Sequence, residues 1–304
     1  VSNYSLFEIS QKSTSVVTQE LNINGMLCVF NRPRIEYNSY NGNLQIYDTK
    51  MDEWKFIASK FEKRANHNIH FFNDKIYVIG GKRISRDGQK EYLADKIEVF
   101  DTKNYSVKID NTNPHQAINF ASVLYKDNII LLGGSTKMHE NGEKEYTPKV
   151  HLYNLTSGYW YELGDMPQEK EVNGILINDK IYLVGGFYKK MLNCIETFDL
   201  TTNNWEVEAE LFTQMFRPAL VYHNNILYIF ENGKLCTYNI LTKKLNEYKI
   251  GLYLNSAAMY YANNKLFIVG GFQFDNYSIT PSSRVFSIDL AEFIDTKINN
   301  SKSF

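Results

Sequence analysis

Histidine and cysteine are the side chains most often used to bind metals or to act as nucleophiles, and the chain has few of either. Its six histidines include one close pair, His67 and His70, and strand alternation would point these two to opposite faces. Its three cysteines lie in apolar runs without a Cys-x-x-Cys spacing, which indicates buried free thiols. No nucleophile-elbow, dinucleotide-binding or phosphate-loop motif is present. We therefore expect no metal, no cofactor and no nucleophilic catalytic motif.

Carboxylates and arginines are the remaining candidates for chemistry. A converging carboxylate and arginine suit a polar ligand such as a sugar, and the carboxylate can then act as a general acid or base. Glu171 and Arg217 are the best candidates for such a pair, and Glu231 offers a second carboxylate. Arg217 could equally satisfy backbone carbonyls or pair with Glu231.

Charge and hydropathy exclude several classes of partner. The chain has 33 basic and 34 acidic residues, so it lacks the positive charge that a nucleic-acid-binding surface requires. No apolar run approaches the length of a membrane span. The chain begins at Val1 rather than Met, so we expect a processed or truncated N-terminus, and the compartment stays open between cytoplasmic and exported.

The elements that position these residues follow from an internal repeat. The word "DKIYVIGG" at residues 74–81 returns almost unchanged at residues 179–186. Each apolar run ends in a glycine pair, and there are four such pairs: Gly80-Gly81, Gly133-Gly134, Gly185-Gly186 and Gly270-Gly271. Two degenerate copies, at residues 25–31 and 226–233, complete a set of six, and in the second copy Glu231-Asn232 stands where the glycines would be.

A second signal follows each copy in phase. An aromatic residue and an Asp or Asn come after the glycine pair, as in Phe100-Asp101 and Phe198-Asp199, and favour a tight turn. Six residues later three copies have a tryptophan, namely Trp54, Trp160 and Trp205. Each unit therefore reads as four antiparallel strands, and such units at this period are typical of a β-propeller, in which tryptophans fill the space between blades.

The glycine doublet, the downstream aromatic-Asp pair and the tryptophan resemble the kelch repeat. The resemblance covers residues 15 to 290 and implies an all-β, six-bladed β-propeller that makes up a single domain, residues 1–304. Its approximate blades are 15–58, 66–110, 118–164, 171–209, 217–249 and 255–290. Because the tail lacks the turn and the tryptophan, we expect residues 3–10 to supply the outer strand of the last blade and so remove an open sheet edge.

The resemblance also implies where ligands bind. In propellers of this type, the loops that lead into the innermost strand and those that leave the second strand gather on one face. Four loops of the second kind are long here, and tyrosine and arginine are enriched at binding hot spots. The ligand-binding residues expected from these positions are Arg32, Asn66, Lys82, Arg83, Asn119, Glu171, Arg217 and Tyr277.

Two functions fit these expectations. The first is a non-catalytic module that binds a protein or peptide, with arginines gripping acidic groups, in some relatives as part of a longer chain. The alternative is a carbohydrate-active enzyme of the kelch type, such as a sialic-acid mutarotase, in which Glu171 and Arg217 would be catalytic. Copper oxidases of related fold are disfavoured, because no set of copper ligands can be assigned.

Overall fold

The structure is a computed structural model. It describes residues 16–23, 26–32, 44–48, 51, 53–57, 61–62, 64–85, 87, 90–139, 141–274, 279–282 and 284–304.

The repeated apolar runs form buried strands that are packed on both faces. In β7 (Lys75–Ile79), Ile76 and Val78 belong to one hydrophobic cluster, while Tyr77 and Ile79 belong to another. Successive side chains of a strand point to opposite faces, so the whole run is apolar only because both faces are covered.

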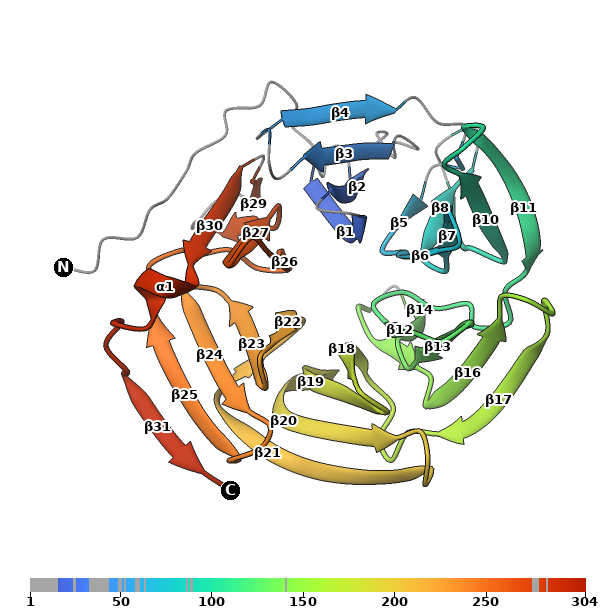
Figure 1. Cartoon of the computed structure of the whole chain (residues 1–304). Coiled ribbons are helices and arrows are strands. Elements are labelled where there is room, and N and C mark those ends of the chain that lie inside the picture. The colour runs from blue at the N-terminus through green and yellow to red at the C-terminus, as the bar shows by residue number, and fades with distance from the viewer. Residues whose placement is uncertain are drawn as a thin grey trace.

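Six main sheets follow one another around a common centre, and the first strand of each sheet is innermost (Figure 1). Sheet one contains β1 (Val16–Ile23), β2 (Met26–Arg32), β3 (Leu44–Asp48) and β4 (Glu53–Ile57). Sheet two contains β6 (Asn68–Phe72), β7, β10 (Lys96–Asp101) and β11 (Ser106–Thr112). Sheet three contains β12 (Ala121–Tyr125), β13 (Asn128–Leu132), β16 (Lys149–Asn154) and β17 (Trp160–Asp165). Sheet four contains β18 (Glu171–Ile177), β19 (Lys180–Tyr188), β20 (Lys190–Asp199) and β21 (Asn204–Met215). Sheet five contains β22 (Ala219–His223), β23 (Ile226–Glu231), β24 (Lys234–Asn239), β25 (Lys244–Lys249) and β31 (Asn300–Ser303), and sheet six contains β26 (Ala258–Ala262), β27 (Lys265–Val269) and β30 (Val285–Asp289). This all-β architecture is a β-propeller.

The long loops after the second strands fold into small ribbons of their own. These are β8 (Lys82–Ile84) with β9 (Glu91–Leu93), β14 (Ser135–Met138) with β15 (Lys144–Tyr146), and β28 (Phe272–Phe274) with β29 (Ile279–Pro281). The first ribbon also pairs with β5 (Arg64–Ala65). Each ribbon pairs with the segment that leads into the first strand of its main sheet. The paired residues are Ala65 and Lys82 in sheet two, Ile118 and Ser135 in sheet three, and Asn255 and Phe272 in sheet six.

The glycine doublets confirm the structural interpretation of the repeat. All eight glycines have positive φ, from 62° at Gly185 to 112° at Gly186. A Cβ on the second glycine would lie 2.5 Å from the Ala65 carbonyl at Gly81 and 2.5 Å from the Glu171 carbonyl at Gly186. The doublet thus lets the strand end close against the segment that enters the sheet.

The turn and tryptophan signals are confirmed where they are described. Asp101 and Asp199 each accept two backbone N–H bonds from the residues that follow them. Trp205 stacks on Phe198 at 4.7 Å and packs against the cluster shared by sheets three and four. Trp160 packs between sheets two and three and donates a hydrogen bond to the Thr112 carbonyl at 2.9 Å.

Sheets five and six depart from the expected four strands. The tail forms a short helix, α1 (Leu290–Phe293), and then β31, which pairs with β25 as a fifth strand of sheet five. Sheet six has three strands among the described residues. As expected, the tail does not supply a fourth strand to sheet six, but it does add a strand to sheet five, because β31 needs only backbone pairing with an existing edge and carries no turn motif. The predicted outer strand at residues 3–10 lies outside the described residues.

Two cysteines confirm the expectation of free thiols. Cys194 is partly buried and Cys236 is buried, and burial raises the pKa of Cys236 to about 12. Cys28 lies on β2, where the side chains are outside the described set. Among the helices that the structure describes, none has the length and apolar character needed to cross a membrane.

Candidate functional site

The predicted binding residues that lead into the first strands have a backbone role. Asn66, Asn119 and Ser256 have φ values of 56°, 56° and 50°. This left-handed conformation is rare for residues other than glycine, and asparagine tolerates it best. The residue type at Asn66 and Asn119 is therefore explained by the chain path, with no need for a ligand.

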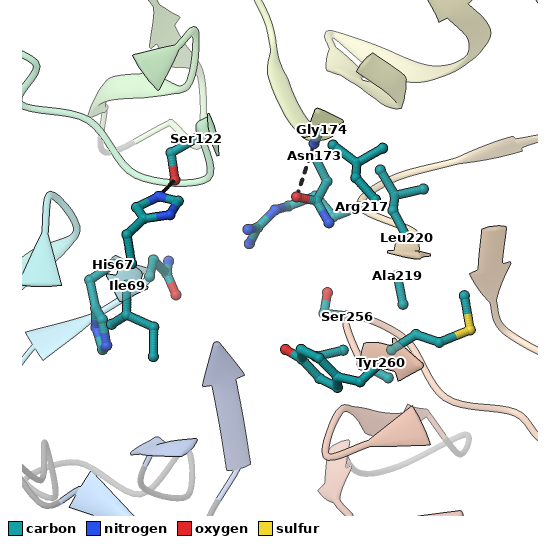
Figure 2. A pocket seen from close by; sticks show the side chains of 16 residues that line it. His67, Ile69, Ser122, Asn173, Gly174, Arg217, Ala219, Leu220, Ser256 and Tyr260 are labelled. Atoms are coloured by element: carbon teal, nitrogen blue, oxygen red, sulfur yellow. Dashed lines mark hydrogen bonds between the residues drawn. The ribbon is translucent and has the colours of Figure 1, made fainter. Parts of the chain in front are cut away.

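Two of the predicted residues, Arg217 and Asn66, line a cavity of about 230 Å³ at the centre of the ring. Ser256, Asn173, His70 and Tyr260 also contribute to its wall. Figure 2 shows the Arg217 guanidinium and the Tyr260 ring both directed toward the middle of the ring. This central cavity is where the propeller brings the first strands of different sheets together.

His67 and His70 both line the central cavity. Strand alternation does not apply, because His67 precedes β6. His70 is hydrogen-bonded to Ser122 through Nε2 at 2.7 Å, and burial lowers its pKa to about 4. Among the described residues no cluster of three or more His, Cys, Asp or Glu side chains is suited to a metal ion.

A hydrogen-bonded chain joins Arg217, Asn119 and Glu171 across sheets three, four and five. Arg217 Nη1 donates to Asn119 Oδ1 at 2.7 Å, and Asn119 Nδ2 donates to Glu171 Oε1 at 3.1 Å. Glu171 and Arg217 thus belong to one hydrogen-bonded network. The contact is indirect, since the amide of Asn119 separates the two charges.

Glu171 is sealed inside this network. Its side chain is fully buried, and its carboxylate accepts hydrogen bonds from Ser135 at 2.6 Å and from Lys144 at 2.9 Å on each oxygen. A carboxylate with three donors and no exposed surface cannot reach a sugar in the central cavity. The geometry gives no support to Glu171 as a catalytic acid or base.

Glu231 replaces a glycine of the doublet and holds the backbone near Arg217. Its carboxylate accepts hydrogen bonds from the backbone N–H of Phe216 at 2.7 Å and of Arg217 at 3.2 Å. Burial raises the pKa of Glu231. The left-handed pair in this copy is Asn232-Gly233, with φ values of 47° and 81°, and it forms a two-residue hairpin of the Asn-Gly type between Glu231 and Lys234.

Arg217 keeps part of its hydrogen-bonding capacity unused. Its Nε is buried without a hydrogen-bond partner in the part of the chain that the structure describes. Burial lowers the pKa of Arg217, whereas Glu171 and Glu231 raise it, and an arginine stays charged at all ordinary pH values. Arg217 is thus a cation that lines the central cavity and keeps part of its surface exposed.

Lys82 and Arg83 are engaged within their own ribbon. Lys82 Nζ lies 2.8 Å and 2.7 Å from the two carboxylate oxygens of Glu91. Arg83 lies 3.6 Å from Glu62 and 3.7 Å from Asp95, and it covers the Tyr92 ring at 5.3 Å. Neither side chain lines the central cavity.

The side chains of the last two predicted residues, Arg32 and Tyr277, lie outside the part of the chain that the structure describes. Arg32 ends β2 and pairs with Val16, as the repeat requires, but its side chain is outside the described set. Tyr277 lies outside the described residues.

A second hollow, which we call the side groove, was missed from the sequence. Its volume is about 870 Å³, and it lies between the β14–β15 ribbon and the β19–β20 hairpin. It is lined by His139, Asn141, Gly142, Glu143, Lys144, Glu145, Tyr146, Phe187, Lys189, Met191 and Phe216. The one available signal was Phe216, which directly precedes Arg217 in the sequence.

Comparisons with known proteins agree with the architecture. The family model for the KLHDC2/KLHL20/DRC7 Kelch-repeats domain matches residues 22–233, more than half of the chain. Kelch-like protein 23 of Homo sapiens is 26% identical over 200 residues, which are 64% of this chain and 31% of that protein. Kelch-like protein 40 of Xenopus laevis is 26% identical over 184 residues, 60% of this chain and 29% of that protein. Alpha-scruin of Limulus polyphemus is 24% identical over 194 residues, 60% of this chain and 20% of that protein. The chain thus spans a third or less of the length of these curated relatives.

Proposed function

The chain belongs to the kelch-repeat family, and on that premise we propose that it is a non-catalytic module that binds a protein or peptide. The binding surface is the face that carries the ribbons after the second strands. The observation that carries this proposal is Arg217, a partly exposed cation whose guanidinium is directed into the central cavity. An acidic group of a partner is the ligand that such a cation fits.

The surroundings of Arg217 support the same face. The β8–β9, β14–β15 and β28–β29 ribbons each pair with a segment that leads into a first strand, so they flank the mouth of the central cavity. The side groove adjoins this mouth, because Phe216 lines the groove and Arg217 lines the cavity. A protein segment could therefore contact both hollows at once.

Six blades closed by the N-terminal segment form part of the proposal. The contacts of β1 with both β6 and β26 support a ring of six. The outer side of β30 has no neighbouring strand among the described residues, which leaves room for one more. In sequence, residues 3–10 alternate apolar and polar side chains, as a strand covered on one face does.

The function is tested by affinity capture with the 304-residue chain as bait. Proteins bound by the wild type are compared with those bound by Arg217→Ala and by Arg217→Ala together with Arg32→Ala. We expect the specifically bound proteins to fall at least tenfold, since truncating a central arginine anchor typically costs about 2 kcal/mol or more. Lys108→Ala, which removes an exposed cation on β11, is the matched control and should leave capture unchanged.

Melting curves of the same variants show whether each one is folded. Equal capture by folded Arg217→Ala and wild type would exclude this face as the binding surface.

A further inference from the structure

The side groove has an apolar floor made of aromatic rings. Phe187 and Phe216 meet edge to face with centroids 5.7 Å apart, and Tyr146 and Tyr188 meet at 5.4 Å. Met191 adds a thioether that is 47% exposed. Aromatic rings together with a flexible methionine form a surface that accepts bulky apolar side chains.

Lys144 crosses this floor without contributing a free charge. Both oxygens of Glu171 hold its ammonium at 2.9 Å, and the same ammonium lies 5.3 Å from the Phe187 centroid and 5.8 Å from the Phe216 centroid. The Lys144–Glu171 pair is neutral as a whole, so the floor presents rings and methylene groups. An apolar side chain can enter here without stripping water from an unpaired charge.

The β19–β20 side of the groove carries unpaired cations. Lys189 and Lys190 are exposed at the tip of the hairpin, and neither has a carboxylate partner within ion-pair distance in the described part of the chain. The opposite wall is nearly balanced, because Glu145 pairs with Lys137 at 3.4 Å and with His139 at 2.8 Å. Among the described residues of that wall, Glu143 accepts a hydrogen bond from Asn141 and is the acidic group without a cation.

We propose that the side groove takes a bulky apolar side chain of an acidic peptide segment, whose carboxylates meet Lys189 and Lys190. This inference rests on the proposed function and adds a second contact, between the side groove and an apolar side chain of the partner. Arg217 lines the central cavity, Lys189 lines the groove, and Lys190 follows Lys189 at the tip of the hairpin, so positive charge stands near the apolar floor. The partner sequence is therefore an acidic stretch interrupted by one large apolar residue, such as phenylalanine or leucine.

The test uses short fluorescein-labelled peptides built on a Gly/Ser background and the full 304-residue chain. One peptide carries two glutamates and a phenylalanine, the second carries the glutamates with alanine, the third carries the phenylalanine with serines, and the fourth carries the phenylalanine with two lysines. We expect the first peptide to bind about tenfold more tightly than the second, from the apolar area that the groove buries. The third and fourth should bind more weakly than the first.

Variants assign the binding to the groove. Met191→Ser should reduce the affinity for the first peptide several-fold and leave the second unchanged. Lys189→Asn with Lys190→Gln should weaken both acidic peptides and reduce the salt dependence. Asparagine suits position 189 because Lys189 has a φ of 58°. Val207→Ser on β21 is the matched control, since Val207 is an apolar residue of the same sheet that is 66% exposed.

Each outcome decides between the two levels of the proposal. Equal binding of the phenylalanine and alanine peptides, or an unchanged affinity in Met191→Ser, overturns the groove inference and leaves the proposed function standing. If none of the peptides binds while proteins are still captured through Arg217, the inference is wrong and the function holds. If protein capture does not depend on Arg217, the proposed function itself is wrong.

Discussion

At the scale of single residues, the second glycine of each doublet is fixed by two separate demands, a positive φ and a close carbonyl. Gly81 (φ 80°) has both, because a Cβ would lie 2.5 Å from the Ala65 carbonyl and 2.7 Å from His67 N. Gly142 has a φ of 84°, and a Cβ there would meet nothing within 4 Å. Comparing Gly81 with Gly142 therefore separates the effect of steric overlap at Cβ from the effect of a strained φ.

We predict that Gly142→Ala lowers the free energy of unfolding by about 1–2 kcal/mol and that Gly81→Ala lowers it by roughly 2–4 kcal/mol. The larger loss comes from moving the lead-in segment of sheet two, since backbone atoms cannot yield as a flexible side chain does. Urea unfolding of both variants measures the difference. Equal losses would mean that the overlap at Gly81 relaxes without cost.

Two buried histidines predict a loss of stability in mild acid. His115 Nε2 lies 2.8 Å from the Gly133 carbonyl and therefore carries a proton, so its Nδ1 accepts the hydrogen bond from His151 Nδ1 at 2.9 Å. Burial, with a smaller contribution from His151, lowers the pKa of His115 to about 3, and burial lowers the pKa of His70 to about 4.

The unfolded chain binds these protons near pH 6.5, so the stability from each neutral ring is present above that pH and is lost as the pH falls toward the folded pKa values. Each histidine should lower the free energy of unfolding by roughly 2 kcal/mol between pH 6.5 and about pH 5. Urea midpoints across this range measure the slope. His115→Gln should remove its share of this slope and leave the share of His70.

At the scale of elements, the tail shows how a sheet edge is covered by backbone pairing. β31 pairs with β25, and its contacts include Asn300 Nδ2 to Glu247 at 2.8 Å and Ser301 Oγ to Asn246 at 2.7 Å. Removing it would expose the outer edge of β25, and an exposed edge is a template for pairing with another chain.

Deletion of residues 299–304 should therefore lower the free energy of unfolding by about 1–2 kcal/mol and promote self-association. Thermal unfolding and light scattering measure the two effects. Ser301→Ala, which removes one side-chain bond and keeps the strand, is the control and should remain monodisperse. A truncated chain as stable and monodisperse as the control would show that β31 does not protect the edge.

The sequence predicted regular elements better than it predicted the site, for a physical reason. Strand runs, doublets and Asp turns are local demands on the backbone, so each leaves its own residue type, as at Asp101 and Gly81. At Asn66 and Asn119 asparagine suits a φ of 56°, so the residue type alone does not indicate binding. The side groove depends on the packing of Lys144 between sheets three and four, and no local pattern reports that contact.

At the scale of the whole molecule, the repeat made the propeller predictable because each sheet buries its faces only against its neighbours. Among the described residues, five hydrophobic clusters are each shared between consecutive sheets, and each mixes residues from segments far apart in the chain. The ring must also join its first and last sheets, and that junction depends on chain ends outside the repeat. Residues 3–10 are outside the described residues, so closure stays a prediction.

We predict that deleting residues 1–12 lowers the melting temperature by about 10 °C or more, because an unpaired β30 edge leaves the last sheet one strand short. The deletion of residues 299–304 is the comparison, since β31 is a fifth strand added outside a complete sheet of four. Closure by the N-terminal segment requires the first deletion to be much the more damaging. A melting temperature that barely moves would mean that another segment, or no segment, covers β30.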